Sequence, residues 1–78
     1  MLKLLDPVIS RIALPAQGED AAVRVGDVGT VVDMGQANGI THYMVEFCDE
    51  DGQTLAMPTF TVDQIQIQGS AQPQLQAA

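Results

Sequence analysis

The sequence predicts an all-β fold, a small five-stranded barrel with one short helical turn before the last strand. Short β-branched runs are separated by turn residues at intervals of about 8 to 12 positions, which is typical of barrels and sandwiches. A sandwich would need more strands than this chain of 78 residues offers. With 46% hydrophobic residues but no Trp, one Tyr and two Phe, the core of this single domain is expected to be aliphatic.

The first strand is expected over residues 7–15. This run contains several β-branched residues, and Pro7 and Pro15 are tolerated at the ends of a strand. An amphipathic helix over residues 2–14 is the alternative, but it would place Pro7 in the helix interior. The strand is therefore the preferred prediction.

The second strand is expected over residues 28–34, after a loop over residues 16–27. Gly26 permits a turn before the strand, and Gly29 is expected to let the strand bend or bulge. A phosphate-binding loop is the alternative for these glycines, but it would need more glycines, a nearby lysine and a following helix. The glycines are therefore expected to be structural.

The third strand is expected over residues 42–48, after a turn over residues 35–39. In that turn, Asn38 and Gly39 supply the positive φ angles that a tight reversal needs. The strand alternates cleanly, which is the clearest period-2 pattern in the chain. The side chains expected on its buried face are Tyr43, Val45 and Phe47.

A fourth strand is expected over residues 53–60, and its proline suggests a strand end or an edge position. Residues 61–64 are expected to form a helical turn, and residues 65–68 a last strand with both isoleucines inward. Residues 69–78 have no periodicity, so we expect a disordered tail after a domain over residues 1–68. This order of elements matches an SH3-like barrel.

Three stretches of the chain carry a family resemblance: LLDPVISRIALP, VRVGDVGTVVDM and HYMVEFCDEDGQTLAMPTFTVDQIQ. Through them, over roughly residues 3 to 67, the chain resembles a family of short bacterial proteins catalogued as domain of unknown function 4926. The resemblance implies an SH3-like fold and transfers no catalytic residues. It also suggests neighbouring toxin-like genes, which would fit an immunity or antitoxin role. The loop over residues 36–41 looks longer than the family pattern, and the Gln-rich tail is extra.

Ten acidic residues against three basic ones give a formal net charge of -7. This charge repels phosphate backbones, so no nucleic acid is expected as a partner. A basic protein or peptide is easier to accommodate. The alternative is that the negative charge only keeps a small apolar domain in solution.

Two acidic loops are the candidate partner-binding sites. The candidate residues are Glu19, Asp20, Asp49, Glu50 and Asp51. The stretch FCDEDGQT, which contains the last three, is first of all a hairpin signal, because Asp51-Gly52 lies between two alternating apolar runs. A calcium loop is the alternative, but with Gly52 at its sixth position the anchoring positions fall on Phe47 and Pro58.

No catalytic residue, cofactor or metal is predicted. His42 and Cys48 are the only residues of their types, and on one strand they would lie about 20 Å apart, too far for a nucleophilic pair. One Cys with one His also falls short of a zinc site. The single Cys makes the cytoplasm the default location, and no window approaches the roughly 20 apolar residues of a membrane span.

The leading hypothesis is therefore a non-enzymatic protein-interaction module that binds a basic protein through its acidic loops. The partner would be a toxin to be neutralised or a larger enzyme that this chain accompanies as an accessory subunit. The alternative is a nucleic-acid-binding barrel of the transcription or ribosomal type, which shares the GDVGTVV turn but would need basic stripes and stacking aromatics. We expect a monomer, or a weak homodimer paired through an edge strand near residues 57–60.

Overall fold

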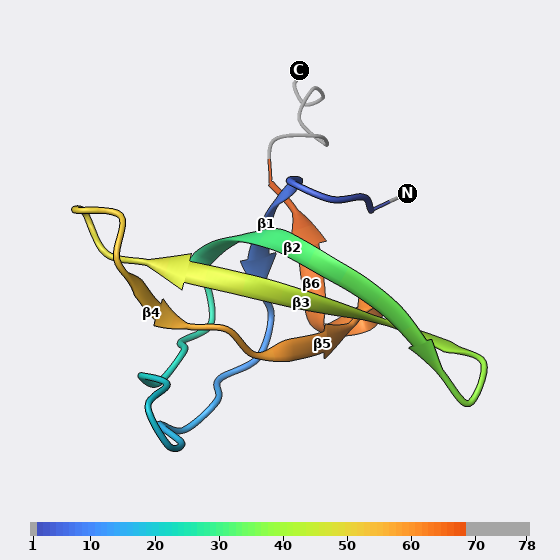
Figure 1. Ribbon diagram of the computed structural model, residues 1–78, viewed down its shortest axis with the longest axis horizontal. Helices are drawn as coiled ribbons and strands as arrows, with labels where there is room; N and C mark the ends of the chain where they lie inside the picture. The colour runs from blue at the N-terminus through green and yellow to red at the C-terminus, as the bar shows by residue number, and fades with distance from the viewer. Residues whose placement is uncertain (1, 69–78) are drawn as a thin grey trace.

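The computed structural model of the chain describes residues 2–68, so the predicted tail over residues 69–78 lies outside the described residues. Within them the chain forms strands joined by turns and one short 3-10 helix (Figure 1). The elements are β1 (Pro7–Ser10), β2 (Val28–Ala37), β3 (Ile40–Cys48), β4 (Thr54–Ala56), β5 (Thr59–Thr61), η1 (Val62–Gln64) and β6 (Ile65–Ile67). The all-β class and the helical turn before the last strand are confirmed.

The strands form one curled antiparallel sheet in the order β4-β3-β2-β1-β6, and β5 also pairs with β3. Strand β3 is therefore central, because it pairs with β2 on one side and with β4 and β5 in succession on the other (Figure 1). In the described residues no strand pairing joins β6 to β4 or β5. The sheet is compact and barrel-like but does not close.

The predicted fourth strand is two strands, β4 and β5, separated by Met57 and Pro58. At this break, one backbone group bonds to a side chain and another still bonds to β3. The Met57 N–H donates to the Asp20 carboxylate at 3.3 Å, and the Pro58 carbonyl accepts from the Val45 N–H at 2.9 Å. Proline has no N–H to give to a ladder, so the break falls where a continuous strand would be weakest.

Strand β1 ends at Ser10 rather than at Pro15. The buried Ser10 hydroxyl donates to the Ile12 carbonyl at 2.6 Å and accepts from the Ile12 N–H at 3.3 Å, so it forms a local turn that competes with strand pairing. The loop that follows folds back on itself, because Leu14 and Val23 exchange backbone hydrogen bonds of 2.8 and 2.9 Å.

Strands β2 and β3 form the longest hairpin of the sheet. Its turn consists of Asn38 and Gly39 alone, with φ angles of 55° and 77°, as a tight two-residue hairpin requires. The turn predicted over residues 35–39 is therefore too long, because Gly35 remains extended and pairs with His42. The loop that looked longer than the family pattern is the end of this hairpin.

The core lies between the curled layers of the sheet. Its buried residues are Leu2, Val8, Val23, Val31, Tyr43, Val45, Phe47, Ala56, Phe60 and Ile65. All three aromatic residues belong to it, and the rings of Phe47 and Phe60 meet edge to face with centroids 6.2 Å apart. The expected alternation in β3 is confirmed, and most of the buried core residues are aliphatic, as expected. The three aromatic residues are buried with them, whereas no methionine of the described residues is buried.

Gly29 is buried where β2 crosses close to β3. A Cβ atom at this position would lie 2.6 Å from Val45 Cγ1 and 2.8 Å from the Glu46 carbonyl oxygen. The predicted bulge is real but lies further along β2, where the register shifts between Val31 and Asp33. Gly29 is therefore required by close packing and not by a bulge.

Candidate partner-binding surface

The turn between β3 and β4, residues 49–53, is organised by one of its own acids. Oδ1 of Asp49 accepts hydrogen bonds from the N–H groups of Asp51 and Gln53 at 2.8 and 3.0 Å. Gly52 has a φ of 84° and donates its N–H to the Asp49 carbonyl at 3.0 Å. The predicted hairpin tip is thus confirmed, and Asp49 has a structural task while Glu50 and Asp51 are exposed.

The second acidic loop is a tight turn in which Gln17 and Asp20 exchange backbone hydrogen bonds of 2.9 and 3.0 Å. Gly18, with a φ of 59°, allows the reversal. The Asp20 carboxylate then reaches the N–H of Met57, so this acid fastens the loop to the β4–β5 connection. Glu19 at the tip is exposed.

The two acidic loops lie on either side of β4 and do not merge into one cluster (Figure 1). Strand β4 follows directly from the turn over residues 49–53. Its other edge is bound by the loop over residues 16–27, because the Ala21 N–H donates to the Leu55 carbonyl at 2.8 Å. In the described residues, no group of three or more His, Cys, Asp or Glu residues could hold a metal ion.

Most of the acidic side chains lack a positive partner. All ten acids and all three bases fall within residues 2–68, and the single ion pair there joins Lys3 Nζ to Asp6 Oδ1 at 3.4 Å. The other nine acids therefore have no ion pair in the described part of the chain. Their uncompensated charge makes the electrostatic potential around the protein negative.

A hollow of about 450 Å³ opens beside β4, between the loop over residues 16–27 and the sheet. Its lining residues are Ala22, Arg24, Asp27, Val28, Phe47, Cys48 and Leu55. Sequence reasoning missed this hollow, because its residues come from four separate segments and none forms a motif. Val28 and Leu55, two large apolar residues of this lining, are exposed in the structure.

Cys48 and His42 both belong to β3, as predicted, and lie six residues apart along that extended strand. Partial desolvation and the neighbouring Glu46 carboxylate raise the pKa of the exposed Cys48 thiol. Nδ1 of His42 lies 3.1 Å from the Ile40 carbonyl and is occupied locally. The structure does not bring these two side chains together.

Asp63 stabilises the start of η1. The Thr61 hydroxyl donates to its carboxylate, and the Thr61 N–H donates to Oε1 of Gln64 at 3.0 Å. The hydrogen bond from Thr61 lowers the pKa of the Asp63 carboxyl group below its usual value.

No helix among residues 2–68 is long and apolar enough to cross a membrane.

Comparison with known proteins adds one finding. The family model described as domain of unknown function DUF4926 matches residues 4–67. Neither the curated proteins nor the solved structures give a match. The match covers most of the chain and confirms the resemblance seen in the sequence: the protein belongs to the DUF4926 family of domains of unknown function.

Proposed function

We propose that this protein is a non-enzymatic interaction module whose acidic loops bind a basic surface of another protein. The observation that supports this proposal is the number of acids without an ion pair, nine of ten in the described residues. Five of the nine occupy the two turns beside β4: Glu19, Asp20, Asp49, Glu50 and Asp51.

In each of the two turns, one acidic residue has a structural role and the others are available for contact with a partner. Asp49 accepts backbone hydrogen bonds within its own turn, and Asp20 fastens its turn to the Met57 N–H. Glu19, Glu50 and Asp51 are exposed on these fixed turns. Because the turns are shaped before binding, little conformational entropy is lost when a partner docks. Their charge acts mainly on the association rate and on the choice of partner.

The proposed partner is a cytoplasmic protein with a lysine- or arginine-rich face. A toxin that this chain neutralises and a larger enzyme that it accompanies as an accessory subunit both meet this description. The chain itself would act as a monomer or a weak homodimer. A nucleic-acid partner fits less well, because the same uncompensated acids repel phosphate.

Affinity capture from native cells, followed by mass spectrometry, tests the proposal. The captured protein should be released by moderate salt, and the variant Glu50→Gln/Asp51→Asn should capture much less of it. The variant Asp33→Asn/Asp63→Asn is the control, because it also removes two negative charges, both outside the two turns. Its folded state is checked by circular dichroism, since Asp63 accepts a hydrogen bond at the start of η1. Capture that resists salt, or that both double variants reduce equally, would contradict a role for the acidic turns.

A further inference from the structure

We infer that the hollow beside β4 holds one large apolar side chain of a partner segment that carries lysine or arginine next to it. This rests on the proposed function and adds the second half of the contact, namely where the apolar part of a basic partner is held.

The hollow offers apolar surface on both sides of β3. Val28, at the start of β2, is 47% exposed, and Leu55, in β4, is 44% exposed. Phe47 lies on the strand between them and is only 6% exposed. A partner side chain seated between Val28 and Leu55 would cover apolar surface that water now touches, which is a favourable contact.

The walls of the hollow are fixed by backbone hydrogen bonds. The Ala21 N–H donates to the Leu55 carbonyl at 2.8 Å and holds the loop over residues 16–27 against β4. At the other wall, the Asp27 carboxylate accepts the Arg24 N–H at 2.8 Å, and the Ser10 N–H donates to the Asp27 carbonyl at 2.9 Å. The hollow is therefore present before any ligand arrives, which favours binding.

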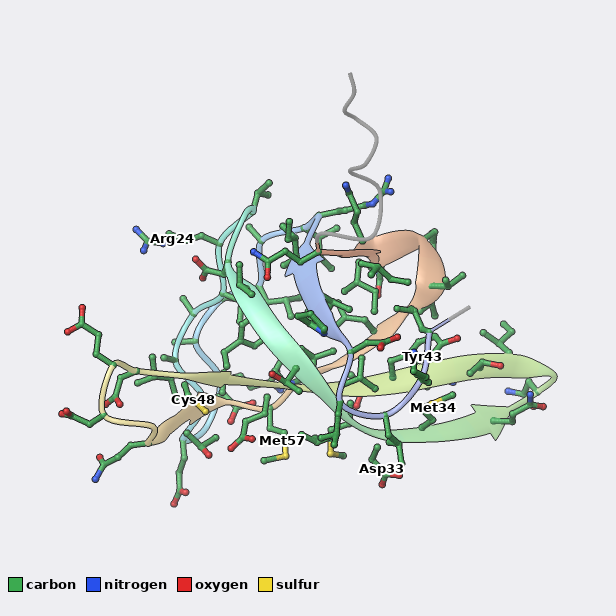
Figure 2. All side chains as sticks on the ribbon, turned by 90° about the horizontal axis from the view of Figure 1, so that it is seen from above. Arg24, Asp33, Met34, Tyr43, Cys48 and Met57 are labelled. Carbon is green, nitrogen blue, oxygen red and sulfur yellow. The ribbon has the colours of Figure 1, made fainter. Side chains whose placement is uncertain are left out.

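The charges around the hollow define the occupant. The acidic turn over residues 49–53 begins immediately after Cys48, which lines the hollow. Arg24 is the one basic residue of the lining, and it has no ion pair in the described residues. In Figure 2 Arg24 lies apart from Cys48, with Arg24 at the upper left and Cys48 below it. The cation of the partner is thus expected on the Cys48 side, near the acidic turn and away from Arg24.

Three blocked peptides serve as probes: Lys-Lys-Leu-Lys-Lys, Lys-Lys-Ala-Lys-Lys and Glu-Glu-Leu-Glu-Glu. Each is titrated into the isotope-labelled full chain, and backbone amide shifts are followed by NMR. The leucine-containing basic peptide should shift the amides of Val28, Phe47 and Leu55 and bind about tenfold more tightly than the alanine peptide, as burial of most of an isobutyl group predicts. The acidic peptide should leave these amides unchanged.

Three single variants make the test specific. Leu55→Ala should remove most of the difference between the leucine and alanine peptides, whereas Ile40→Ala, which truncates an aliphatic residue 52% exposed at the far hairpin, should keep it. Arg24→Gln should tighten both basic peptides, because it removes a repulsive charge.

The outcomes separate this inference from the proposed function. Equal affinity for the two basic peptides, with shifts confined to residues 49–53, would overturn the apolar site and leave the acidic turns as the binding surface. Acidic and basic peptides that bind equally well would contradict the proposed function itself. No shift with any peptide at millimolar concentration would overturn both.

Discussion

The carboxylate of Asp20 accepts a hydrogen bond from the backbone N–H of Met57, 37 residues further along the chain, at a distance of 3.3 Å. This contact joins an acidic loop to the break between β4 and β5. It gives one of the candidate binding residues a second task, because the same oxygen atoms that carry the charge also satisfy a backbone group that the interrupted strand leaves without a ladder partner.

Replacing Asp20 should therefore lower stability as well as charge. We expect Asp20→Ala to reduce the free energy of unfolding by about 1 kcal/mol, the usual net worth of one hydrogen bond, and Asp20→Asn to lose less because it keeps an acceptor oxygen. Urea denaturation measures both. The control is Glu19→Ala, an exposed neighbour whose loss should change the stability by less than about 0.5 kcal/mol. Equal losses for Asp20→Ala and Glu19→Ala would show that only charge matters here.

Gly29 should tolerate no side chain. A Cβ atom there would meet Val45 Cγ1 and the Glu46 carbonyl at distances that real contacts do not reach, so Gly29→Ala should destabilise the chain by about 2 kcal/mol or more. Gly35→Ala is the control in the same strand, because nothing lies within 4 Å of its Cβ position. Thermal unfolding of the two variants should differ by about 10 °C. Similar melting temperatures would mean that β2 and β3 separate easily at Gly29.

The Cys48 thiol should react slowly at neutral pH. Because its pKa is raised, the thiolate fraction that attacks a disulfide reagent is smaller than in the unfolded chain. The rate of reaction with such a reagent, followed against pH, should therefore rise at higher pH for the folded chain than for the chain in urea. Glu46→Gln removes one cause of the shift and should move the folded profile toward lower pH. A folded profile that coincides with the unfolded one would contradict this account of the site.

Asp63 should contribute to stability in a way that depends on acid. Its pKa in the folded chain is lower than in the unfolded chain, so its contribution is fully present above the unfolded pKa and is lost as the pH falls through the folded value. The stability difference between the wild-type chain and Asp63→Asn should be constant at neutral pH and shrink in acid. Urea denaturation over a pH series measures it. A stability difference that does not change with pH would show that the ionised Asp63 carboxylate does not stabilise η1.

Much of the fold follows from local sequence signals. The alternation in β3 and the Asn38-Gly39 turn were predictable because each depends on neighbouring residues alone. Pro58 suggested a strand end or an edge position, but the split into β4 and β5 was not predictable, since the Asp20 carboxylate that binds the Met57 N–H is distant in sequence. Gly29 was identified as structural, but its reason is the approach of β3, which no local pattern reveals.

The candidate surface divides in the same way. Acidic turns are visible in a sequence because charge and turn residues are local properties, and Asp49 and Asp51 were identified from them. The hollow beside β4 was not visible, because Val28 and Leu55 come near each other only once the sheet has formed. The structural roles of Asp20 and Asp49 were likewise not predictable, because residue types alone do not show which backbone amide a carboxylate will bind.

The association rate with the captured partner, measured as a function of salt, tests the central claim most directly. For the wild-type chain this rate should fall steeply as salt rises, and Glu50→Gln/Asp51→Asn should lower it at low salt and flatten its salt dependence. The control variant Asp33→Asn/Asp63→Asn should stay close to the wild-type chain. An association rate that is independent of salt, or the same for both double variants, would contradict recognition through the acidic turns.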